Sequence, residues 1–139
     1  MLSYDGYCYD NGVKHDLNSK QCSMKIYVAH EYGRRHGKSD IECEINTWKA
    51  INIGRKLIEL GHNPLVPNLW HFIAKDWKHS AEDESMWYDL VSSWIEDCDA
   101  LFVGKYPEWE NSGVQQEIEL ADTLGVPVYW NLEDIPKVL

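Results

Sequence analysis

The sequence predicts an α/β fold with a doubly wound, mostly parallel sheet of four to five strands flanked by helices. Two observations carry this prediction. Short apolar runs rich in β-branched residues, such as residues 25–29 and 99–104, are typical of buried parallel strands. Stretches with helical apolar spacing lie between these runs, and strands that alternate with helices form parallel sheets. A chain of 139 residues with 44% hydrophobic content can bury one such core.

The domain is expected to begin at Met24. Residues 1–23 are polar, rich in Tyr, Asp and Asn, and without a period, so we interpret them as an irregular N-terminal extension to the α/β domain of residues 24–139. The first strand, residues 25–29, leads into a polar loop over residues 30–38.

Elements of the first half follow in order. Ser39-Asp40-Ile41-Glu42 matches a capping box and predicts the start of a helix, and Gly61 has the position of its C-terminal cap. The apolar positions of this helix at helical spacing include Ile41, Ile45, Trp48, Ile51 and Ile58. Residues 63–67 predict a short strand between prolines, which leads into an aromatic loop containing His71.

The second half repeats the alternation. A helix is predicted over about residues 82–97, a buried strand over 99–104, a helix from Ser112 to about Leu124, and a strand over 126–130. Pro127 cannot donate a hydrogen bond to a neighbouring strand, so this last strand is expected at an edge of the sheet. The whole order indicates a flavodoxin-like or Rossmann-like architecture, in which ligands bind beyond the carboxyl ends of the strands.

Charge and composition exclude several classes of partner. The formal net charge of −10 argues against a nucleic-acid polymer or an anionic membrane as the partner. No apolar run approaches the roughly 18 residues that cross a bilayer, and the first residues do not resemble a signal peptide, so a cytoplasmic protein is expected. The cysteines show no close pair, which disfavours both a disulfide framework and a zinc site, although Cys8, His15 and Cys22 are conceivable ligands. No metal and no cofactor is expected.

The segment Asn111–Ala121 carries the strongest chemistry. Ser112 and Gly113 open the predicted helix, where free backbone N–H groups favour an anion such as phosphate. Glu117 falls within the apolar stripe of that helix, on the side that should be buried. Beside a bound phosphate, such a carboxylate could act as a nucleophile at a sugar carbon. Alternatively, Ser112 only caps the helix and Glu117 pairs with an arginine at the rim.

Other polar and aromatic residues also have two possible interpretations, one functional and one structural. Arg34 and Arg35 either capture a phosphate or carboxylate or belong to a solvated basic loop. Trp109, just before the phosphate turn, either stacks on a nucleobase or covers apolar surface. His30 ends the first strand and His71 follows the second, so either could contact a ligand in the crevice.

The order of these segments is similar to a known family. The segments are KIYVAHEYGRR, the helix ending LIELGHNP, VPNLWHF, WIEDCDAL, YPEWENSGVQQEIELA and GVPVY, over about residues 24–131. They resemble the nucleoside 2-deoxyribosyltransferase-like superfamily, in particular its DUF4406-type branch, which is related to the deoxyribonucleoside 5'-monophosphate N-glycosidases.

The resemblance implies a role for each matching residue. Glu117 would be the nucleophile that attacks C1′, and Tyr27 would orient it. Asn111, Ser112 and Gly113 match the phosphate turn, and Gly33, Arg34 and Arg35 match the loop after the first strand. A homo-oligomer, a dimer or higher, is also implied.

One departure from the family bears on catalysis. The family has an Asp eight residues before the Asp of the third strand, and the matching position here is Val91. Asp89 lies two residues away, about 200° around the helix, and is the substitute candidate. The first hypothesis is therefore an N-glycosidic bond hydrolase or deoxyribosyltransferase acting on a nucleoside 5'-monophosphate. The alternatives are a non-catalytic nucleotide-binding module and a structural or partner-binding protein.

Overall fold

The predicted parallel sheet is present. The computed structural model describes residues 7–10, 13–16, 23–77, 84–109 and 112–138, without the side chains of residues 7–16, 35, 84 and 85. Within that part of the chain, a four-stranded sheet has the order β4-β3-β5-β6, and each pairing in it is parallel. This is the doubly wound α/β fold that the alternation of elements predicted.

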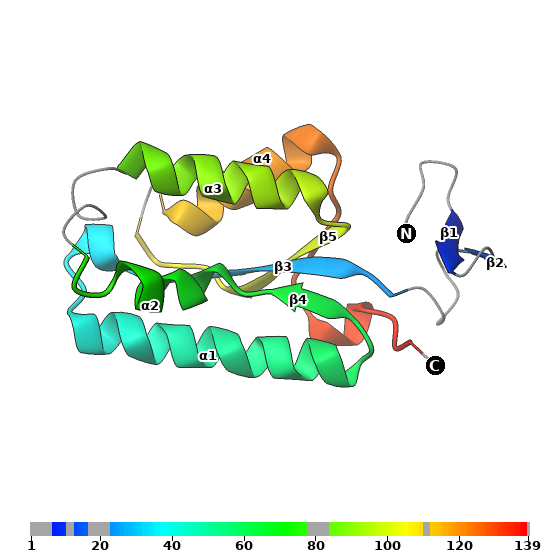
Figure 1. The fold of residues 1–139 in the computed structure, drawn as a ribbon, viewed down its shortest axis with the longest axis horizontal. Coiled ribbons are helices and arrows are strands. Elements are labelled where there is room, and N and C mark those ends of the chain that lie inside the picture. The colour runs from blue at the N-terminus through cyan, green and yellow to red at the C-terminus, as the bar shows by residue number, and fades with distance from the viewer. Residues whose placement is uncertain (1–6, 11–12, 17–22, 78–83, 110–111, 139) are drawn as a thin grey trace.

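The two central strands are longer than the two edge strands. The centre holds β3 (Lys25–His30) and β5 (Ala100–Lys105), and the edges hold β4 (Asn63–Leu65) and β6 (Val128–Tyr129). Helices α1 (Asp40–Glu59) and α2 (Trp70–Ala74) lie on one side of the sheet, and α3 (Glu84–Asp97) and α4 (Gly113–Leu124) lie on the other (Figure 1). Short 3-10 turns connect them at Arg34–His36, Pro67–Leu69 and Leu132–Asp134.

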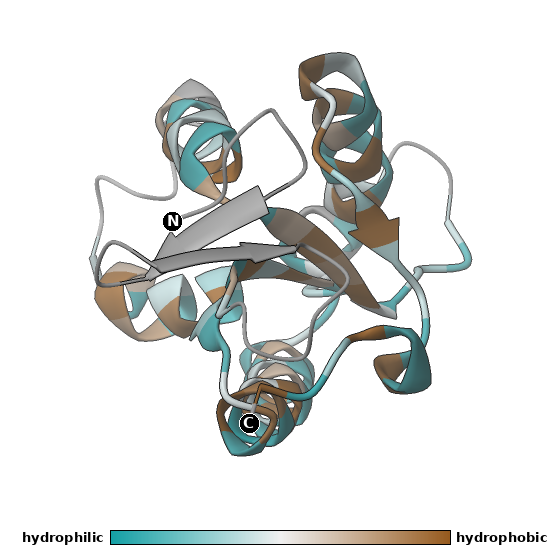
Figure 2. Cartoon of the chain, turned by 90° about the vertical axis from the view of Figure 1, so that its right-hand side faces the viewer, coloured by the Kyte–Doolittle hydropathy of each residue, from teal (hydrophilic) through white to brown (hydrophobic). Residues whose placement is uncertain are grey.

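The central strands separate two hydrophobic clusters. Ile26 and Val28 of β3 pack toward α1, whereas Tyr27 and Ala29 pack toward α3 and α4, as the two-residue repeat of a strand requires. The strands of the sheet are correspondingly coloured as hydrophobic in Figure 2, while the helices are mixed. Tyr27 therefore carries a hydroxyl into the mainly apolar layer between the sheet and helices α3 and α4.

Each edge strand has a proline, with Pro64 inside β4 and Pro127 directly before β6. The carbonyl of Pro127 accepts a hydrogen bond from the N–H of Leu101 at 2.9 Å, so the proline uses the one backbone group that it retains. The prediction of an edge strand at residues 126–130 is confirmed, although the paired part is only Val128–Tyr129.

Helix α1 begins and ends as predicted. The Ser39 hydroxyl accepts from the N–H of Glu42 at 3.2 Å, and Gly61 adopts a positive φ of 92° after the last turn. The N–H of Gly61 then bonds the carbonyl of Ile58, and the N–H of His62 bonds that of Leu57, which is the Schellman pattern.

Most of the apolar positions at helical spacing in α1 do not face the sheet. Ile41, Ile45, Trp48 and Ile58 are exposed, and Ile51 is partly buried. The face against the sheet consists of smaller or polar residues: Cys43, Asn46, Thr47, Ala50, Gly54 and Leu57. The reason is a close approach between helix and sheet, because a Cβ at Gly54 would lie only 2.9 Å from Cγ2 of Val66.

The interpretation of residues 1–23 as irregular is wrong for two segments. Strands β1 (Tyr7–Asp10) and β2 (Val13–Asp16) pair in an antiparallel hairpin. Asn11-Gly12, between them in the sequence, is a common signal for a two-residue hairpin loop and was available from the sequence. Residues 1–6, 11–12 and 17–22, including Cys22, lie outside the described residues.

Candidate functional site

The site lies where the winding of the sheet reverses. After β3 the chain passes through α1 to β4 on one side, and β5, which pairs with the other side of β3, continues through α4 to β6. In such sheets the carboxyl ends of the two strands at the reversal leave a crevice between their loops. Glu31 and Lys105 extend these strands, and their side chains form an ion pair at 2.7 Å, with the Glu31 N–H bonded to the Lys105 carbonyl at 3.2 Å.

Tyr27 and Glu117 come together behind this edge. Tyr27 is fully buried in the middle of β3, and Glu117 is partly exposed in the second turn of α4. The Tyr27 hydroxyl has no hydrogen-bond partner of ordinary geometry among the described residues, yet it interacts with the Glu117 carboxylate. The two side chains are thus neighbours without a well-formed bond.

Burial changes the acidity of both groups. It raises the pKa of Glu117 to about 8, and the Tyr27 hydroxyl opposes this change by stabilising the carboxylate. Burial, and then the charge of Glu117, raise the pKa of Tyr27 well above its ordinary value. Glu117 therefore holds its proton to near-neutral pH while remaining partly accessible, a combination that is enriched at functional sites.

The start of α4 has the features of an anion site. Ser112 is completely buried, and its hydroxyl accepts a hydrogen bond from the N–H of Gln115 at 3.0 Å. Ser112 therefore caps the helix, as the structural alternative for this residue predicted. Gly113 is the first helical residue, and no acidic side chain lies in the first turn. The N–H groups of Gly113 and Val114 have no hydrogen-bond acceptor among the described residues, which suits them to bind an anion. Asn111, predicted to share this turn, lies outside the described residues.

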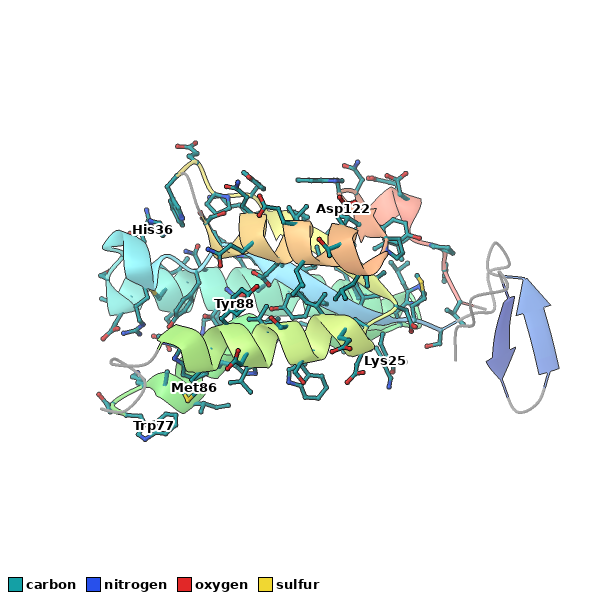
Figure 3. All side chains as sticks on the ribbon, turned by 90° about the horizontal axis from the view of Figure 1, so that it is seen from above. Lys25, His36, Trp77, Met86, Tyr88 and Asp122 are labelled. Atoms are coloured by element: carbon teal, nitrogen blue, oxygen red, sulfur yellow. The ribbon has the colours of Figure 1, made fainter. Side chains whose placement is uncertain are left out.

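The loops after β3 and β5 meet through aromatic and basic side chains. The rings of His36 and Trp109 lie 4.8 Å apart at a tilt of 31°, and the Lys38 ammonium is 5.8 Å from the centre of the Trp109 ring. Gly33 makes this turn possible, because its φ is 98° and a Cβ there would lie 2.3 Å from Cγ of Lys38. Figure 3 shows His36 at the opposite end of the α/β domain from Lys25, the first residue of β3.

Trp109 carries a second buried group without a partner. Its indole Nε1 is inaccessible to solvent and makes no hydrogen bond within the described part of the chain. In this structure the Trp109 ring lies against His36, and its N–H has no acceptor among the described residues. Stacking of Trp109 on a nucleobase stays a prediction.

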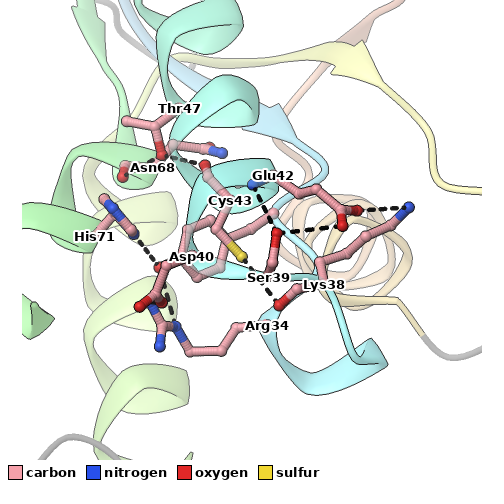
Figure 4. A network of polar contacts seen from close by, with 10 residues as sticks. Arg34, Lys38, Ser39, Asp40, Glu42, Cys43, Thr47, Asn68 and His71 are labelled. Carbon is pink, nitrogen blue, oxygen red and sulfur yellow. Dashed lines mark hydrogen bonds and ion pairs between the residues drawn. The ribbon is translucent and has the colours of Figure 1, made fainter.

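Arg34 is directed toward α1 and α2. Its Nη2 pairs with Oδ1 of Asp40 at 2.9 Å, and its Nε donates to the Tyr32 hydroxyl at 3.2 Å (Figure 4). The Tyr32 hydroxyl lies 2.6 Å from Nδ1 of His71. Arg34 can only donate, so the Tyr32 hydroxyl accepts its hydrogen bond and can donate its own proton to Nδ1 of His71. The neutral imidazole of His71 then carries its hydrogen on Nε2.

His71 is the third residue with a buried, unpartnered polar atom. Its Nε2 makes no hydrogen bond to any described residue, and the side chain is almost fully buried. Burial lowers the pKa of His71, and the positive charge of Arg34 lowers it further. A neutral imidazole at the end of a hydrogen-bonded chain from Asp40 is therefore available at the carboxyl end of β4.

The structure does not bring all of the predicted site residues together. His30 is buried on the α1 face, where a Cβ at Gly104 would lie 3.0 Å from its ring and 2.5 Å from Ile53, and burial lowers its pKa. Asp89 is exposed on α3, about 200° around the helix from Val91, which packs on the cluster that contains Tyr27. Arg35 lies in the turn after Gly33, and its side chain is outside the described part.

Several residues at this edge were not predicted from the sequence: Glu31, Tyr32, His36, Lys38 and Lys105. Lys105 ends β5 and the other four lie in the loop after β3, and this position beyond a central strand was the available signal. Their pairing across the two loops depends on contacts between distant parts of the sequence, which periodicity does not encode. In the described ranges, no group of three or more potential metal ligands is present, and no helix is long and apolar enough to cross a membrane.

Comparison with known proteins identifies a family whose description states no activity. The model of the family described as "Domain of unknown function (DUF1937)" matches residues 24–132, which is most of the chain. The DUF4406-type branch named from the sequence is not the family that matches, and the description does not mention the nucleoside 2-deoxyribosyltransferase-like superfamily. No curated protein matches significantly.

Proposed function

We propose that this chain, which belongs to the DUF1937 family, cleaves or transfers at the N-glycosidic bond of a nucleoside 5'-monophosphate, with Glu117 as the nucleophile. One observation carries the proposal. A partly accessible carboxylate with a pKa of about 8 lies in the second turn of a helix whose first turn contains no acid. The start of that helix suits a phosphate, and the carboxylate one turn further on suits a sugar carbon close to it.

The chemistry requires ionised Glu117. The carboxylate attacks C1′ and forms a glycosyl ester, while the bond from C1′ to the base nitrogen breaks and its electron pair leaves with the base. Water, or a second base, then displaces the carboxylate. Because the pKa of Glu117 is about 8, a minority of molecules holds the ionised form at neutral pH. Tyr27 favours that form, which gives its buried hydroxyl a role as a positioning group.

Each loop around the crevice has a proposed task. The backbone of Ser112 and Gly113 would hold the phosphate, and Trp109 would stack on the base in exchange for His36. The homo-oligomer that the resemblance implies also remains a prediction.

A non-catalytic nucleotide-binding module is the second candidate. The observation that favours it is the valine at position 91, where the resemblance implies an aspartate that assists the leaving base. Asp89 is exposed on α3, about 200° around the helix from Val91, so it does not occupy the position of that aspartate. Ligand binding at the start of α4 does not require that group.

The test is an incubation with a panel of deoxyribonucleoside and ribonucleoside 5'-monophosphates at pH 8, followed by chromatography for the free base. We expect release of base from at least one nucleotide, and a loss of at least about a thousandfold in the Glu117→Gln variant. Glu119→Gln is the matched control, because it removes an exposed carboxylate from the same helix and should keep full activity.

The two candidates give different results. If no nucleotide releases its base but one raises the melting temperature, the binding module is correct and the enzyme proposal is wrong. If neither effect occurs with any nucleotide, both proposals are wrong.

A further inference from the structure

A phosphate at the start of α4 needs a positive side chain beside it. The chain has a net charge of −10, and a helix start contributes only about half an elementary charge. Helix α4 itself contains no basic residue, so this cation has to come from a neighbouring loop. The loops after β3 and β5 are the neighbours at the carboxyl edge of the sheet.

The ends of β3 and β5 and the loops after them contain three Lys or Arg side chains in the described part of the chain: Arg34, Lys38 and Lys105. Arg34 is held by Asp40 at 2.9 Å and directed toward α1 and α2. Lys105 pairs at 2.7 Å with the nearly buried carboxylate of Glu31. If Lys105 turned toward a ligand, that carboxylate would be left without its partner, which is costly for a buried charge.

Lys38 is held much less firmly. Its ammonium lies 3.5 Å from the Glu42 carboxylate, and the two side chains are 39% and 52% exposed. An exposed ion pair of this kind contributes little to stability. The ammonium also has three hydrogens, so Lys38 can bind a phosphate without giving up Glu42.

The turn after β3 aims Lys38 at the loop before α4. The N–H of Lys38 donates to the carbonyl of Gly33 at 3.1 Å, and a Cβ at Gly33 would lie 2.3 Å from Cγ of Lys38. The stem of Lys38 thus lies across the bare Cα of the glycine. In Figure 4, Lys38 and Arg34 extend from this turn in different directions. The ammonium lies 5.8 Å from the centre of the Trp109 ring, three residues before the helix cap Ser112.

We propose that Lys38 pairs with the 5'-phosphate and is the residue that makes the site prefer a nucleoside 5'-monophosphate to the nucleoside. The inference rests on the proposed function. The resemblance assigns this loop to the ligand through Gly33, Arg34 and Arg35, whereas here Arg34 is engaged elsewhere and Lys38 lies on the side of Trp109. The phosphate would lie between the ammonium and the N–H of Gly113.

The test compares affinities for each nucleoside 5'-monophosphate of the panel and for the matching nucleoside by titration calorimetry at 0.15 M salt. The parent is the full chain with Glu117→Gln, so that turnover does not consume the ligand. Adding Lys38→Gln should lower the affinity for the monophosphate about tenfold, because a hydrogen bond between two charged groups is lost. The affinity for the nucleoside should not change.

Two further variants serve as controls. Lys38→Arg keeps the positive charge and should keep the monophosphate affinity within about threefold of the parent. Lys56→Gln removes the same charge from an exposed position in the last turn of α1 and should leave both affinities unchanged. Lys56 lies about 25 Å along the helix from its start, well beyond the screening length of roughly 8 Å at this salt concentration.

The outcomes separate this inference from the proposed function. If the parent prefers a monophosphate to its nucleoside but Lys38→Gln lowers neither affinity, or lowers both by the same factor, Lys38 does not bind the phosphate and only this inference is wrong. If the parent binds no monophosphate more tightly than its nucleoside, the proposed function fails and this inference fails with it.

Discussion

The starts of α1 and α4 follow the same sequence pattern but have different surroundings. Each has a serine cap followed three residues later by Glu or Gln, as Ser39 with Glu42 and Ser112 with Gln115. In α1 the pattern is exposed, and the first turn carries Asp40 and Glu42, which satisfy the positive end of the helix dipole. In α4 the serine is fully buried and the first turn carries no charge.

This difference shows which helix start is available to a ligand. The first turn of α1 is occupied by acids of the chain itself, and these are paired with Arg34 and Lys38. A bound anion would have to displace them. The first turn of α4 carries no acidic residue of its own, and Glu117 in the next turn holds its proton at neutral pH. The same capping pattern is thus structural in α1 and suited to binding in α4.

The largest expected effect concerns the carboxylates of the two helices. Glu117 has a pKa of about 8 in the folded protein and an ordinary value of 4.5, so the unfolded chain releases its proton first. Stability is therefore lost as the pH rises from 4.5 to about 8, at roughly 1.4 kcal/mol per unit of pKa difference at most. Glu117→Gln lacks this penalty and should be more stable than the wild type at pH 8 by a few kcal/mol, but not at pH 4.5.

Urea denaturation at the two pH values measures this difference. Glu42→Gln in α1 is the control. Its stability relative to the wild type should change by less than about 0.5 kcal/mol between pH 4.5 and pH 8, since it alters only an exposed ion pair with Lys38 and an exposed hydrogen bond from Ser39. An equal pH dependence in both variants would mean that Glu117 is no more buried than Glu42.

An intermediate effect is expected at the two serine caps. Ser112→Ala leaves the N–H of Gln115 without its acceptor in a part-buried position, which should cost about 2 kcal/mol. In Ser39→Ala water can reach the exposed N–H of Glu42, and the cost should be about 0.5–1 kcal/mol. Chemical denaturation of the two variants under identical conditions compares them. A larger loss for Ser39→Ala would show that burial of the cap does not matter.

Local patterns predicted the elements of this fold but not the orientation of α1. The caps at Ser39 and Ser112 and the edge position of Pro127 depend on neighbouring residues, so they could be inferred from the sequence. Periodicity found the stripe of Ile41, Ile45 and Trp48 correctly. It could not show which side of the helix faces the sheet, because that depends on the close approach permitted by Gly54.

The candidate site could likewise be predicted only where local sequence patterns define it. Glu117 was visible as a charge within an apolar stripe, since both the stripe and the charge lie on one helix. The contacts of His36 with Trp109, and of Glu31 with Lys105, join loops about 70 residues apart in the sequence, and no local pattern encodes them. The raised pKa of Glu117 likewise depends on the layer formed by β3 and α4 together.

The smallest effect would make the start of α4 resemble that of α1, and it depends on the proposed function. Gln115→Glu converts the neutral cap pattern of α4 into the acidic one of α1. The added charge interacts favourably with the helix dipole but repels Glu119, which Gln115 contacts at 3.2 Å, so stability should change by less than about 0.5 kcal/mol.

The affinity of Gln115→Glu for a nucleoside 5'-monophosphate should fall about fivefold, corresponding to roughly 1 kcal/mol of lost dipole and charge interaction. Affinity for the matching nucleoside should not change, because the nucleoside lacks the phosphate. Titration calorimetry with both ligands gives the ratio, and Glu42→Gln, which alters the other helix start, should leave both affinities as they are. If Gln115→Glu weakens both ligands equally, the start of α4 does not hold the phosphate.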